Sequence, residues 1–421
     1  MISADEALRI VLDSVSVLGV ERVPMLEALG RVLADEIRST RDIPAFDNSA
    51  MDGYAVRAAD LTAASDSHPV RLTVVETVPA GRMPQHQVGP GQCARTMTGA
   101  PIALGADAIV PVERTRGEGE VVEFLSAAEP GAFVRPRGED LRSGEQVFSA
   151  GRILGPADLG MLASLNRAMV AVYRKPRVAI VATGDELVDI DEHPHGAQIV
   201  NSSAYALAGA VREAGGDAAI LRVARDTKDE VRARLEEAMA FDVILSTGGV
   251  SVGQFDFVKG VLDDLGMRTL FHGVAQKPGR PLKFGSFDTR GARPVFGLPG
   301  NPVSTLVCFY LYARPALRRM AGRGDLGLAR VTVRCGADIK LANNLTEFVR
   351  VRLVREGEES VATPTGNQGS GILSSLSRAD GLLIGPAALA NLHKGDQATV
   401  LRFGADAGDA AFFEERLPHR N

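Results

Sequence analysis

The chain has 421 residues, of which 45% are hydrophobic and 24% charged, and its formal net charge at pH 7 is -5. These values are typical of globular proteins, and the length suggests roughly three domains rather than one hydrophobic core. The negative net charge argues against a protein whose main task is to coat nucleic acid or anionic membrane.

The opening residues and the cysteines bear on the compartment. The first six residues include Asp5 and Glu6 where a secretory signal would carry basic residues, and no apolar run approaches the roughly 18 residues of a spanning helix. The three cysteines are far apart and form no CxxC pair, so neither a disulfide framework nor a structural zinc site is expected. We therefore expect a cytoplasmic protein that has no membrane or nucleic-acid partner.

Residues 1–172 are predicted to be an N-terminal helical region with an embedded β-rich domain at about 54–140. Ser3 and Glu6 form a capping-box pattern, and apolar residues recur at helical spacing until Gly19. Short β-rich runs separated by Pro and Gly follow from about residue 40 to 150. A second helix is predicted over about 156–166, where Pro156 suits the first turn.

Residues 173–326 are predicted to form a three-layer α/β domain with a mostly parallel sheet. Apolar strand-like runs alternate with helices over this stretch, which is typical of a parallel sheet covered by helices. The expected strands are 178–182, 218–223 and 243–246, and the expected helices cover about 203–214 and 227–240. A long apolar helix over about 302–320 closes the domain, and Pro315 is expected to kink it.

The remaining residues are predicted to form a β-barrel-like C-terminal domain over 327–405, followed by a polar tail at 406–421. Five short strand-like runs are separated by turns in the first of these segments.

Three loops that follow predicted strands are candidates for a binding site. Ligands of open α/β sheets bind outside the carboxyl ends of the strands. The loops are Thr183–Leu187, Ser246–Gly253 and Gly297–Ser304. In the second loop, backbone N–H groups around Thr247, Gly248, Gly249 and Ser251 could approach an anion closely, although a Gly-rich turn without a ligand is the plain alternative. The chain has no GxxxxGK(S/T) loop and no convincing GxGxxG fingerprint, which disfavours an ordinary NTPase or dehydrogenase.

Two further segments fit an oxyanion. Asn301 is placed to cap a helix that has Pro302 at its first position, so N–H groups beyond it could face an anion; a well-made helix start is the alternative. The segment Lys277–Lys283 concentrates three cations between two prolines, which would fix donors around a tetrahedral oxyanion. A solvated basic loop is its alternative.

Carboxylates recur beside these loops. Asp185, Glu186, Asp226 and Asp256 could hold magnesium against a substrate pyrophosphate, because this cation prefers carboxylates combined with phosphate oxygens. Any one of them alone is more often a helix cap. Upstream, Asp52 lies in a segment rich in small polar residues, 42–56, which a generic turn would not need.

Six motifs occur in the same order as in one known family and are spread over nearly the whole chain. They are Asp47-Asn48-Ser49-Ala50-Met51-Asp52-Gly53-Tyr54-Ala55, Thr98-Gly99-Ala100-Pro101 with Gly105-Ala106-Asp107-Ala108, Gly138-Glu139-Asp140, Thr183-Gly184-Asp185-Glu186-Leu187, Thr247-Gly248-Gly249-Val250-Ser251-Val252-Gly253, and Gly297-Leu298-Pro299-Gly300-Asn301-Pro302. The chain resembles the molybdopterin molybdenumtransferases, a family that includes the C-terminal domain of gephyrin. The segment Thr365–Ser370 also matches that family.

The resemblance implies a magnesium-dependent reaction in which adenylylated molybdopterin and molybdate give molybdenum cofactor and AMP. It implies an elongated homodimer with four structural domains per chain and an active cleft between subunits, where the Asp52 region of one chain faces the α/β domain of the other. Molybdopterin adenylyltransferase and apo-molybdoenzymes are the further partners that the resemblance suggests. Molybdenum would be captured by the pterin's own dithiolene sulfurs, so no protein cysteine is needed.

The resemblance also implies roles for individual residues. The expected catalytic positions are Asp52, Thr98, Asp140, Glu186, Asp226 and Asp256, of which Glu186, Asp226 and Asp256 would hold magnesium. The expected substrate and oxyanion positions are Thr247, Gly248, Gly249, Ser251, Lys277, Arg280, Pro299, Gly300, Asn301, Pro302, Arg350 and Ser370. Gln276 and Arg280 depart from the family, because these positions often carry Ile and Lys in relatives. Arg280 keeps the charge but changes the donor geometry.

Two other functions remain open at this point. The chain could catalyse the preceding step as a molybdopterin adenylyltransferase, since the α/β domain is common to both activities. It could also be a non-catalytic pterin-binding scaffold, although the retained Asp52, Asp226 and Asp256 disfavour this.

Overall fold

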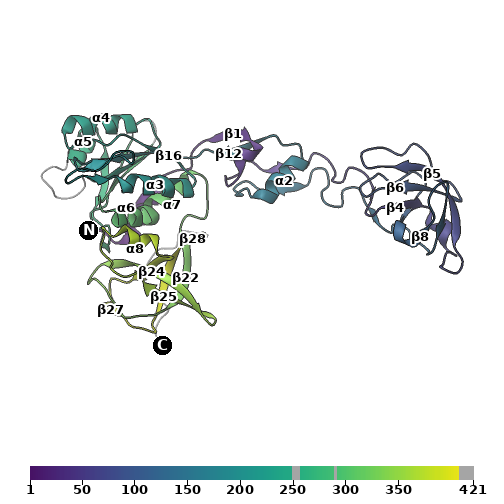
Figure 1. Ribbon diagram of the computed structural model, residues 1–421. Coiled ribbons are helices and arrows are strands. Elements are labelled where there is room, and N and C mark those ends of the chain that lie inside the picture. Colours follow the sequence, from purple (N-terminus) through teal and green to yellow (C-terminus); the bar gives the residue numbers. More distant parts are fainter. Residues whose placement is uncertain (249–256, 289–291, 407–421) are drawn as a thin grey trace. The chain divides into compact units, whose positions relative to one another are not determined.

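The chain folds into two compact units (Figure 1). The computed structural model describes all residues except 249–256, 289–291 and 407–421. The larger unit contains Met1–Ala34, Gly151–Leu159 and the chain from Ala168 onward, and the smaller unit contains Asp35–Ala150 and Gly160–Arg167.

The larger unit is built around a six-stranded sheet. Its strands lie in the order β16 (Asp217–Ile220), β13 (Arg177–Ala182), β17 (Val243–Thr247), β21 (Arg293–Leu298), β20 (Lys283–Phe287) and β18 (Arg268–His272). The first four strands are parallel, and the last two run antiparallel to their neighbours. The prediction of a mostly parallel sheet is therefore confirmed. Its central strands are buried on both faces, which explains their continuous apolar sequences.

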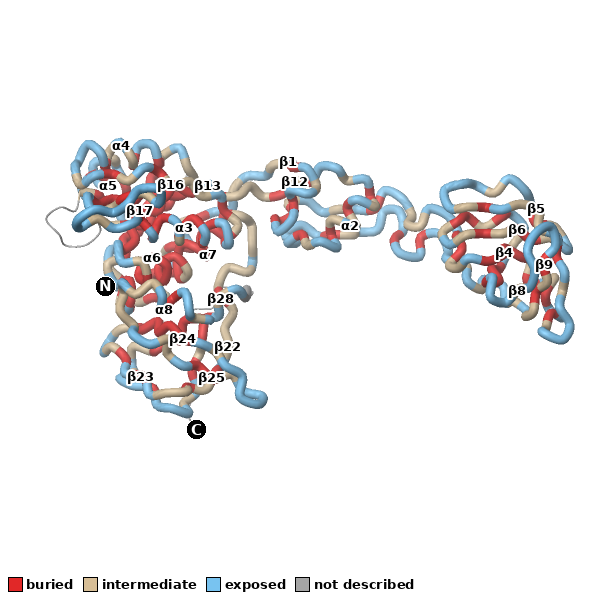
Figure 2. Tube along the Cα trace, viewed as in Figure 1, coloured by how far each residue is buried: buried red, intermediate tan, exposed pale blue. Residues whose placement is uncertain are grey.

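Helices cover both faces of this sheet. Val178 and Ile180 of β13 share one core with one group of helices, whereas Ala179 and Val181 share another core with a second group. Figure 2 shows the buried residues gathered along the strands of this sheet and the helices beside them. Alternating side chains of a strand point to opposite faces, so these two cores are the two sides of a three-layer arrangement. The first group is α1 (Ala4–Asp13), α3 (Ser202–Glu213), α6 (Pro302–Cys308) and α7 (Arg314–Met320); the second is α4 (Lys228–Ala238) and α5 (Phe257–Asp264).

The opening helix α1 begins as the sequence predicts, because the Ser3 hydroxyl accepts a hydrogen bond from the Glu6 N–H at 3.1 Å. Its apolar face packs into the α/β core, where Leu8 and Val11 join Tyr312. Periodicity showed that α1 is amphipathic but not which core it covers. The helix therefore belongs with the α/β layers, although the prediction grouped residues 1–172 together.

The predicted long helix over 302–320 is α6, a π-helical turn η4 (Phe309–Ala313) and α7. Pro315 lies in the first turn of α7. Proline has no N–H to donate and its ring crowds the preceding turn, so the wide π turn before it resolves the conflict. The irregularity predicted at Pro315 thus occurs one turn earlier.

The C-terminal strands close into a ring, which confirms the barrel-like prediction. Successive pairs are formed by β24 (Thr346–Glu356), β25 (Glu359–Pro364), β22 (Leu328–Cys335), β28 (Gln397–Asp406) and β26 (Gly381–Gly385), and β26 pairs again with β24. The short strand β19 (Gln276–Lys277) also pairs with β24, with Lys277 opposite Glu347. The basic segment is therefore tied to the C-terminal strands.

The smaller unit contains a second six-stranded sheet. Its order is β7 (Ala108–Pro111), β4 (Gly53–Val56), β6 (Gln92–Thr96), β5 (Val70–Val78), β9 (Val121–Phe124) and β8 (Thr115–Arg116). The first of the six motifs has glycine at position 53 because a Cβ there would lie 2.1 Å from the Val110 carbonyl oxygen. Tyr54 and Phe124 pack edge to face in its core, with ring centroids 5.6 Å apart.

Short elements complete the two units. The strand pairs are β1 (Val20–Pro24) with β12 (Met169–Tyr173), β2 (Ile37–Arg38) with β11 (Gln146–Phe148), β3 (Asn48–Ser49) with β10 (Val134–Arg135), β14 (Leu187–Val188) with β15 (Ile199–Val200), and β23 (Ile339–Lys340) with β27 (Asn391–Leu392). The short helices are η1 (Met25–Ala28), η2 (Ala58–Leu61), η3 (Val112–Arg114), α2 (Pro156–Ser164) and α8 (Leu373–Ser377). The α-helices within 1–172 are α1 and α2, which match the two helices predicted there, although α1 ends at Asp13 and so before Gly19. Within the described part of the chain, no helix combines the length and apolarity needed to span a bilayer.

Candidate functional site

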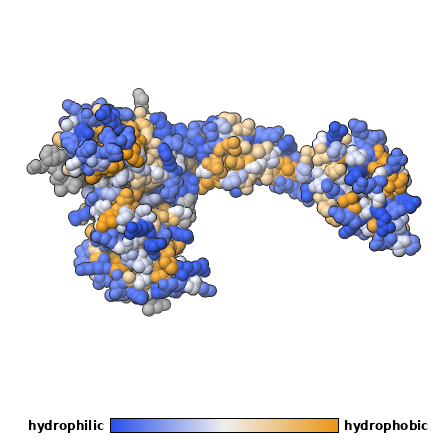
Figure 3. Space-filling model, in the orientation of Figure 1, coloured by the Kyte–Doolittle hydropathy of each residue, from blue (hydrophilic) through white to orange (hydrophobic). Residues whose placement is uncertain are grey.

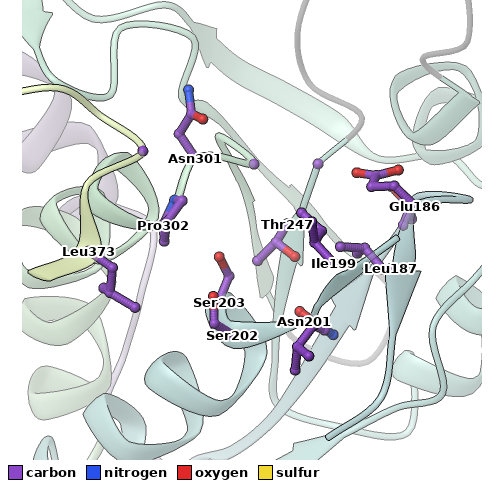
Figure 4. Close-up of a pocket in the computed structure, with 15 residues that line it drawn as sticks. Glu186, Leu187, Ile199, Asn201, Ser202, Ser203, Thr247, Asn301, Pro302 and Leu373 are labelled. Atoms are coloured by element: carbon purple, nitrogen blue, oxygen red, sulfur yellow. The ribbon is translucent and has the colours of Figure 1, made fainter. Parts of the chain in front are cut away.

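A pocket of about 680 Å³ lies in the larger unit at the carboxyl ends of the parallel strands (Figure 4). β13 ends at Ala182, opposite Thr247 of β17, which in turn lies opposite Leu298 of β21. The three loops that leave these ends supply much of the lining. The full set is Thr183, Glu186, Leu187, Ile199, Val200, Asn201, Ser202, Ser203, Thr247, Gly248, Gly300, Asn301, Pro302, Gly371 and Leu373.

Glycines let the loops of the pocket meet closely. Gly248 has φ +85°, and a Cβ there would lie 2.9 Å from the Thr183 carbonyl oxygen. A Cβ at Gly300 would lie 3.6 Å from Gly248 Cα, so the second and third loops are in contact. The structure therefore brings together six of the predicted site residues, namely Glu186, Thr247, Gly248, Gly300, Asn301 and Pro302.

Three other predicted positions lie outside the described residues. They are Gly249, Ser251 and Asp256, in the Gly-rich loop and just after it. Pro299 is buried beside the third loop, and its carbonyl accepts a hydrogen bond from the Thr305 hydroxyl. This bond, together with that from Thr305 N–H to Asn301 O at 2.9 Å, fixes the start of α6.

The start of α3 is a part of the lining that the sequence reasoning missed. Asn201, Ser202 and Ser203 face the pocket, and the Asn201 side chain accepts a hydrogen bond from Ala204 N–H at 3.3 Å. In Figure 4, Ser203 and Thr247 lie between Asn301 on one side and Glu186 on the other. An Asn-Ser-Ser run after a short strand and before a helix was the available signal. Since α3 and α6 both begin here, their N–H dipoles favour an anionic ligand.

Glu186 lines the pocket, whereas its acidic neighbours Asp185 and Asp226 are not among the lining residues. Asp226 N–H donates to Asp185 Oδ1 at 3.2 Å. Burial raises the pKa of Asp226, and the nearby charges of Asp185 and Glu186 raise it further. Within the described residues, no group of three or more His, Cys, Asp or Glu side chains is close enough to hold a metal ion unaided. Any cation here would thus need further oxygen ligands.

The predicted basic residues Lys277 and Arg280 are not among the lining of the pocket. Lys277 Nζ lies 2.9 Å from Glu347 Oε1, and the other oxygen of this buried carboxylate accepts Ala342 N–H at 2.7 Å. The exposed Arg280 donates from Nε to Met1 Sδ at 3.1 Å. Lys277 is half exposed, so part of its donor capacity faces solvent.

Arg350 is almost completely buried, with 1% of its surface exposed. Its guanidinium donates to the Ser375 hydroxyl at 3.2 Å and to the Gly369 carbonyl at 3.0 Å. Burial lowers the pKa of Arg350, and the charge of Glu347 offsets only part of this effect. Ser370 in the same loop accepts a hydrogen bond from Asn301 Nδ2 at 3.1 Å, which links the loop to the pocket.

Asp52, Thr98 and Asp140 belong to the smaller unit. Asp52 Oδ1 accepts two hydrogen bonds from Thr98, one from its N–H and one from its hydroxyl, both at 2.7 Å. These bonds hold the pKa of Asp52 below its ordinary value. Asp140 is exposed, and its N–H donates to the Ile43 carbonyl at 3.0 Å. The pair of Asp52 and Thr98 predicted from separate motifs is thus in direct contact.

Three family models match successive parts of the chain. They describe the MoeA N-terminal region (domain I and II) at residues 2–166, a probable molybdopterin binding domain at 179–319, and the MoeA C-terminal region (domain IV) at 332–403.

Full-length relatives agree with these matches. The chain is 36% identical over 406 residues to molybdopterin molybdenumtransferase 2 of Mycobacterium tuberculosis, covering 95% of this chain and 99% of the relative. It is 33% identical over 412 residues to molybdopterin molybdenumtransferase of Bacillus subtilis, covering 97% and 95%. Among solved structures, a molybdopterin biosynthesis MoeA protein from Pyrococcus horikoshii OT3 is 32% identical, covers 96% of this chain and 100% of its own, and has a TM-score of 0.78. This chain therefore belongs to the molybdopterin molybdenumtransferase family.

Proposed function

We propose that this protein inserts molybdate into adenylylated molybdopterin and releases AMP, forming molybdenum cofactor. The observation that carries the proposal is the pocket of about 680 Å³ at the carboxyl ends of β13, β17 and β21, in a chain that matches a molybdopterin molybdenumtransferase over 95% of its length. Its Gly-rich loops and the two helix starts suit the phosphates and the adenylyl group of such a substrate.

Magnesium is proposed to bind between Glu186, Asp226 and the substrate pyrophosphate. The raised pKa of Asp226 supports this, because a cation would relieve the repulsion among Asp185, Glu186 and Asp226. Magnesium commonly uses one or two carboxylates and completes its shell with phosphate oxygens and water. Asp256 is proposed as a further ligand. The ion would neutralise charge on the pyrophosphate, while the protein holds the substrate in place.

Molybdate is proposed to bind near Lys277, Arg280 and Arg350. A doubly charged oxyanion needs compensating cations and N–H donors. Arg350 supports the proposal most strongly, since a buried guanidinium whose hydrogen-bond partners are a hydroxyl and a carbonyl is costly unless an anion uses it. Ser370 and Asn301, which are joined by a hydrogen bond, would connect this site to the pocket.

A homodimer is proposed, with Asp52, Thr98 and Asp140 of one subunit completing the cleft of the other. Exposed apolar side chains on β1, η1 and β12 and at the end of η1 support an interface (Figure 3), among them Val20, Leu26, Leu29 and Met169. Leu26 has 75% of its surface exposed. Light scattering on the native protein and on Leu26→Asp would test the proposal: the native protein should have twice the mass of one chain, and the variant should dissociate more readily.

A cytoplasmic location is also proposed. Cys93, Cys308 and Cys335 are all free and buried, which suits a reducing compartment. The molybdopterin adenylyltransferase and apo-molybdoenzymes are proposed partners for receiving substrate and delivering product.

The direct test supplies purified protein with adenylylated molybdopterin, magnesium and molybdate, and omits each in turn. The expected result is AMP release that requires molybdate and magnesium, with a product able to activate an apo-molybdoenzyme. Formation of the adenylylated pterin from ATP would instead assign the preceding adenylyltransferase step. Tight pterin binding without turnover would indicate a scaffold.

A further inference from the structure

Gln276 precedes the two basic residues and is fully buried. Its amide nitrogen donates to the Pro278 carbonyl at 2.9 Å and lies 3.6 Å from Cys308 Sγ. Its amide oxygen accepts a hydrogen bond from the hydroxyl of Tyr312, which is also fully buried. Burial raises the pKa of the Tyr312 phenol, so its hydroxyl stays protonated and able to donate. A buried amide thus bridges the basic segment to η4.

Gly279 brings the same segment against the helix at a second point. It has φ +92°, and a Cβ there would lie 2.3 Å from Cys308 Sγ and 2.8 Å from Gln276 Nε2. The Cys308 thiol donates to the Gly279 carbonyl at 3.5 Å. Both the conformation and the space at this position require glycine. The backbone between the two cations is therefore in direct contact with α6.

The outer side of the segment is held by the C-terminal strands. Lys277 lies opposite Glu347 in the pairing of β19 with β24, and its ammonium forms an ion pair with that carboxylate. The segment from Lys277 to Arg280 thus runs between two anchors. One anchor is the ion pair, which solvent weakens because its Lys277 end is half exposed, and the other is the dry hydrogen-bonded bridge.

The dry bridge is the anchor that determines backbone position. Removing the Gln276 amide would leave the Pro278 carbonyl and the Tyr312 hydroxyl without these partners in an apolar interior, and the backbone would shift to restore them. Because Lys277 and Arg280 flank this carbonyl, such a shift would move both cations.

We propose that Gln276 and Tyr312 are positioning residues that fix the Lys277–Arg280 segment for its oxyanion, so they set molybdate affinity without touching molybdate. The inference rests on the proposed function, since molybdate is the anion that this segment would hold. It separates two roles within the network: the cations contact the substrate, and the buried pair places them.

Two variants break the bridge and one matched control leaves it intact. Tyr312→Phe removes a single oxygen, and Gln276→Met replaces the amide with an apolar side chain of similar size. Tyr310→Phe removes a hydroxyl from the same π-helical turn. That hydroxyl donates to Glu213 Oε2 at 3.3 Å, so its hydrogen bond does not involve the basic segment. For each protein, KM for molybdate, KM for adenylylated molybdopterin, kcat and melting temperature are measured.

Tyr312→Phe and Gln276→Met should each raise KM for molybdate by about fivefold. This ratio corresponds to the free energy of one hydrogen bond in a dry site. KM for adenylylated molybdopterin should change by less than about twofold, and Tyr310→Phe should match the native protein. The double variant should be no worse than the worse single variant, because both changes break the same bridge.

Native turnover with an unchanged KM for molybdate in Tyr312→Phe would overturn the positioning role and leave the proposed function standing. Equal increases in both KM values, with a matching fall in melting temperature, would also overturn it, because the pair would then be structural only. Absence of molybdate-dependent AMP release in the native protein would overturn the proposed function and the inference with it.

Discussion

Replacing Arg350 with methionine separates a binding role from a structural one. Arg350→Met removes a guanidinium with two neutral hydrogen-bond partners and keeps most of the volume of the side chain. Each lost bond to a charged donor costs about 1.5 to 3 kcal/mol. Removing a buried cation also removes the desolvation penalty of that cation, which is several kcal/mol and destabilises the native fold. The two effects nearly cancel, so the melting temperature should change by less than about 5 °C.

Molybdate binding should respond very differently to the same change. Loss of one charge-assisted bond to the anion, about 1.5 to 3 kcal/mol, weakens binding roughly 10- to 150-fold. Titration of the purified protein with molybdate in a calorimeter measures this directly. Arg318→Met is the matched control, because Arg318 is equally buried but pairs with Asp325 at 3.0 Å. The control should lose more stability and keep its molybdate affinity. A large drop in the melting temperature of Arg350→Met with unchanged molybdate affinity would refute the reasoning.

Two carboxylates give pH-dependent predictions. The folded state raises the pKa of Asp226 above its ordinary 3.8. The ionised Asp226 carboxylate therefore destabilises the fold, and this destabilisation grows as the pH rises from 3.8 through the folded pKa. Asp226→Asn should therefore melt higher than the native protein at pH 7.5 without divalent cations, and the gap should close below about pH 4; a lower melting temperature at pH 7.5 would contradict this. Thr98→Val removes one of the two bonds that hold down the pKa of Asp52. The acid limb of its pH–rate profile should move toward neutral pH and Thr98→Ser should restore it, whereas an unmoved limb would show that Asp52 ionisation does not limit the rate.

Features that depend on neighbouring residues could be predicted from the sequence. The cap at Ser3 is set by a hydrogen bond to a residue three positions away, and the start of α6 at Pro302 follows from the fixed φ of proline. The carboxyl ends of parallel strands meet at one edge, so the loops at Thr247 and Gly300 could be placed together before their contact was observed.

Features that depend on distant residues could not be predicted in this way. Gln276 and Tyr312 are 36 positions apart, and neither residue type signals that both side chains are fully buried. The pairing of β19 with β24 joins the basic segment to strands about 70 positions later in the chain. Likewise, the contribution of Asn201 to the pocket depends on where α3 begins in space, which periodicity does not fix.

The central claim, insertion of molybdate coupled to loss of AMP, is tested most directly by stoichiometry. A single-turnover reaction with adenylylated molybdopterin and limiting molybdate would be quenched, and the AMP released and the molybdenum bound to pterin would be counted. Equal amounts of the two, rising together with the molybdate supplied, are predicted. AMP release that is independent of molybdate, or molybdenum uptake without AMP release, would contradict the account.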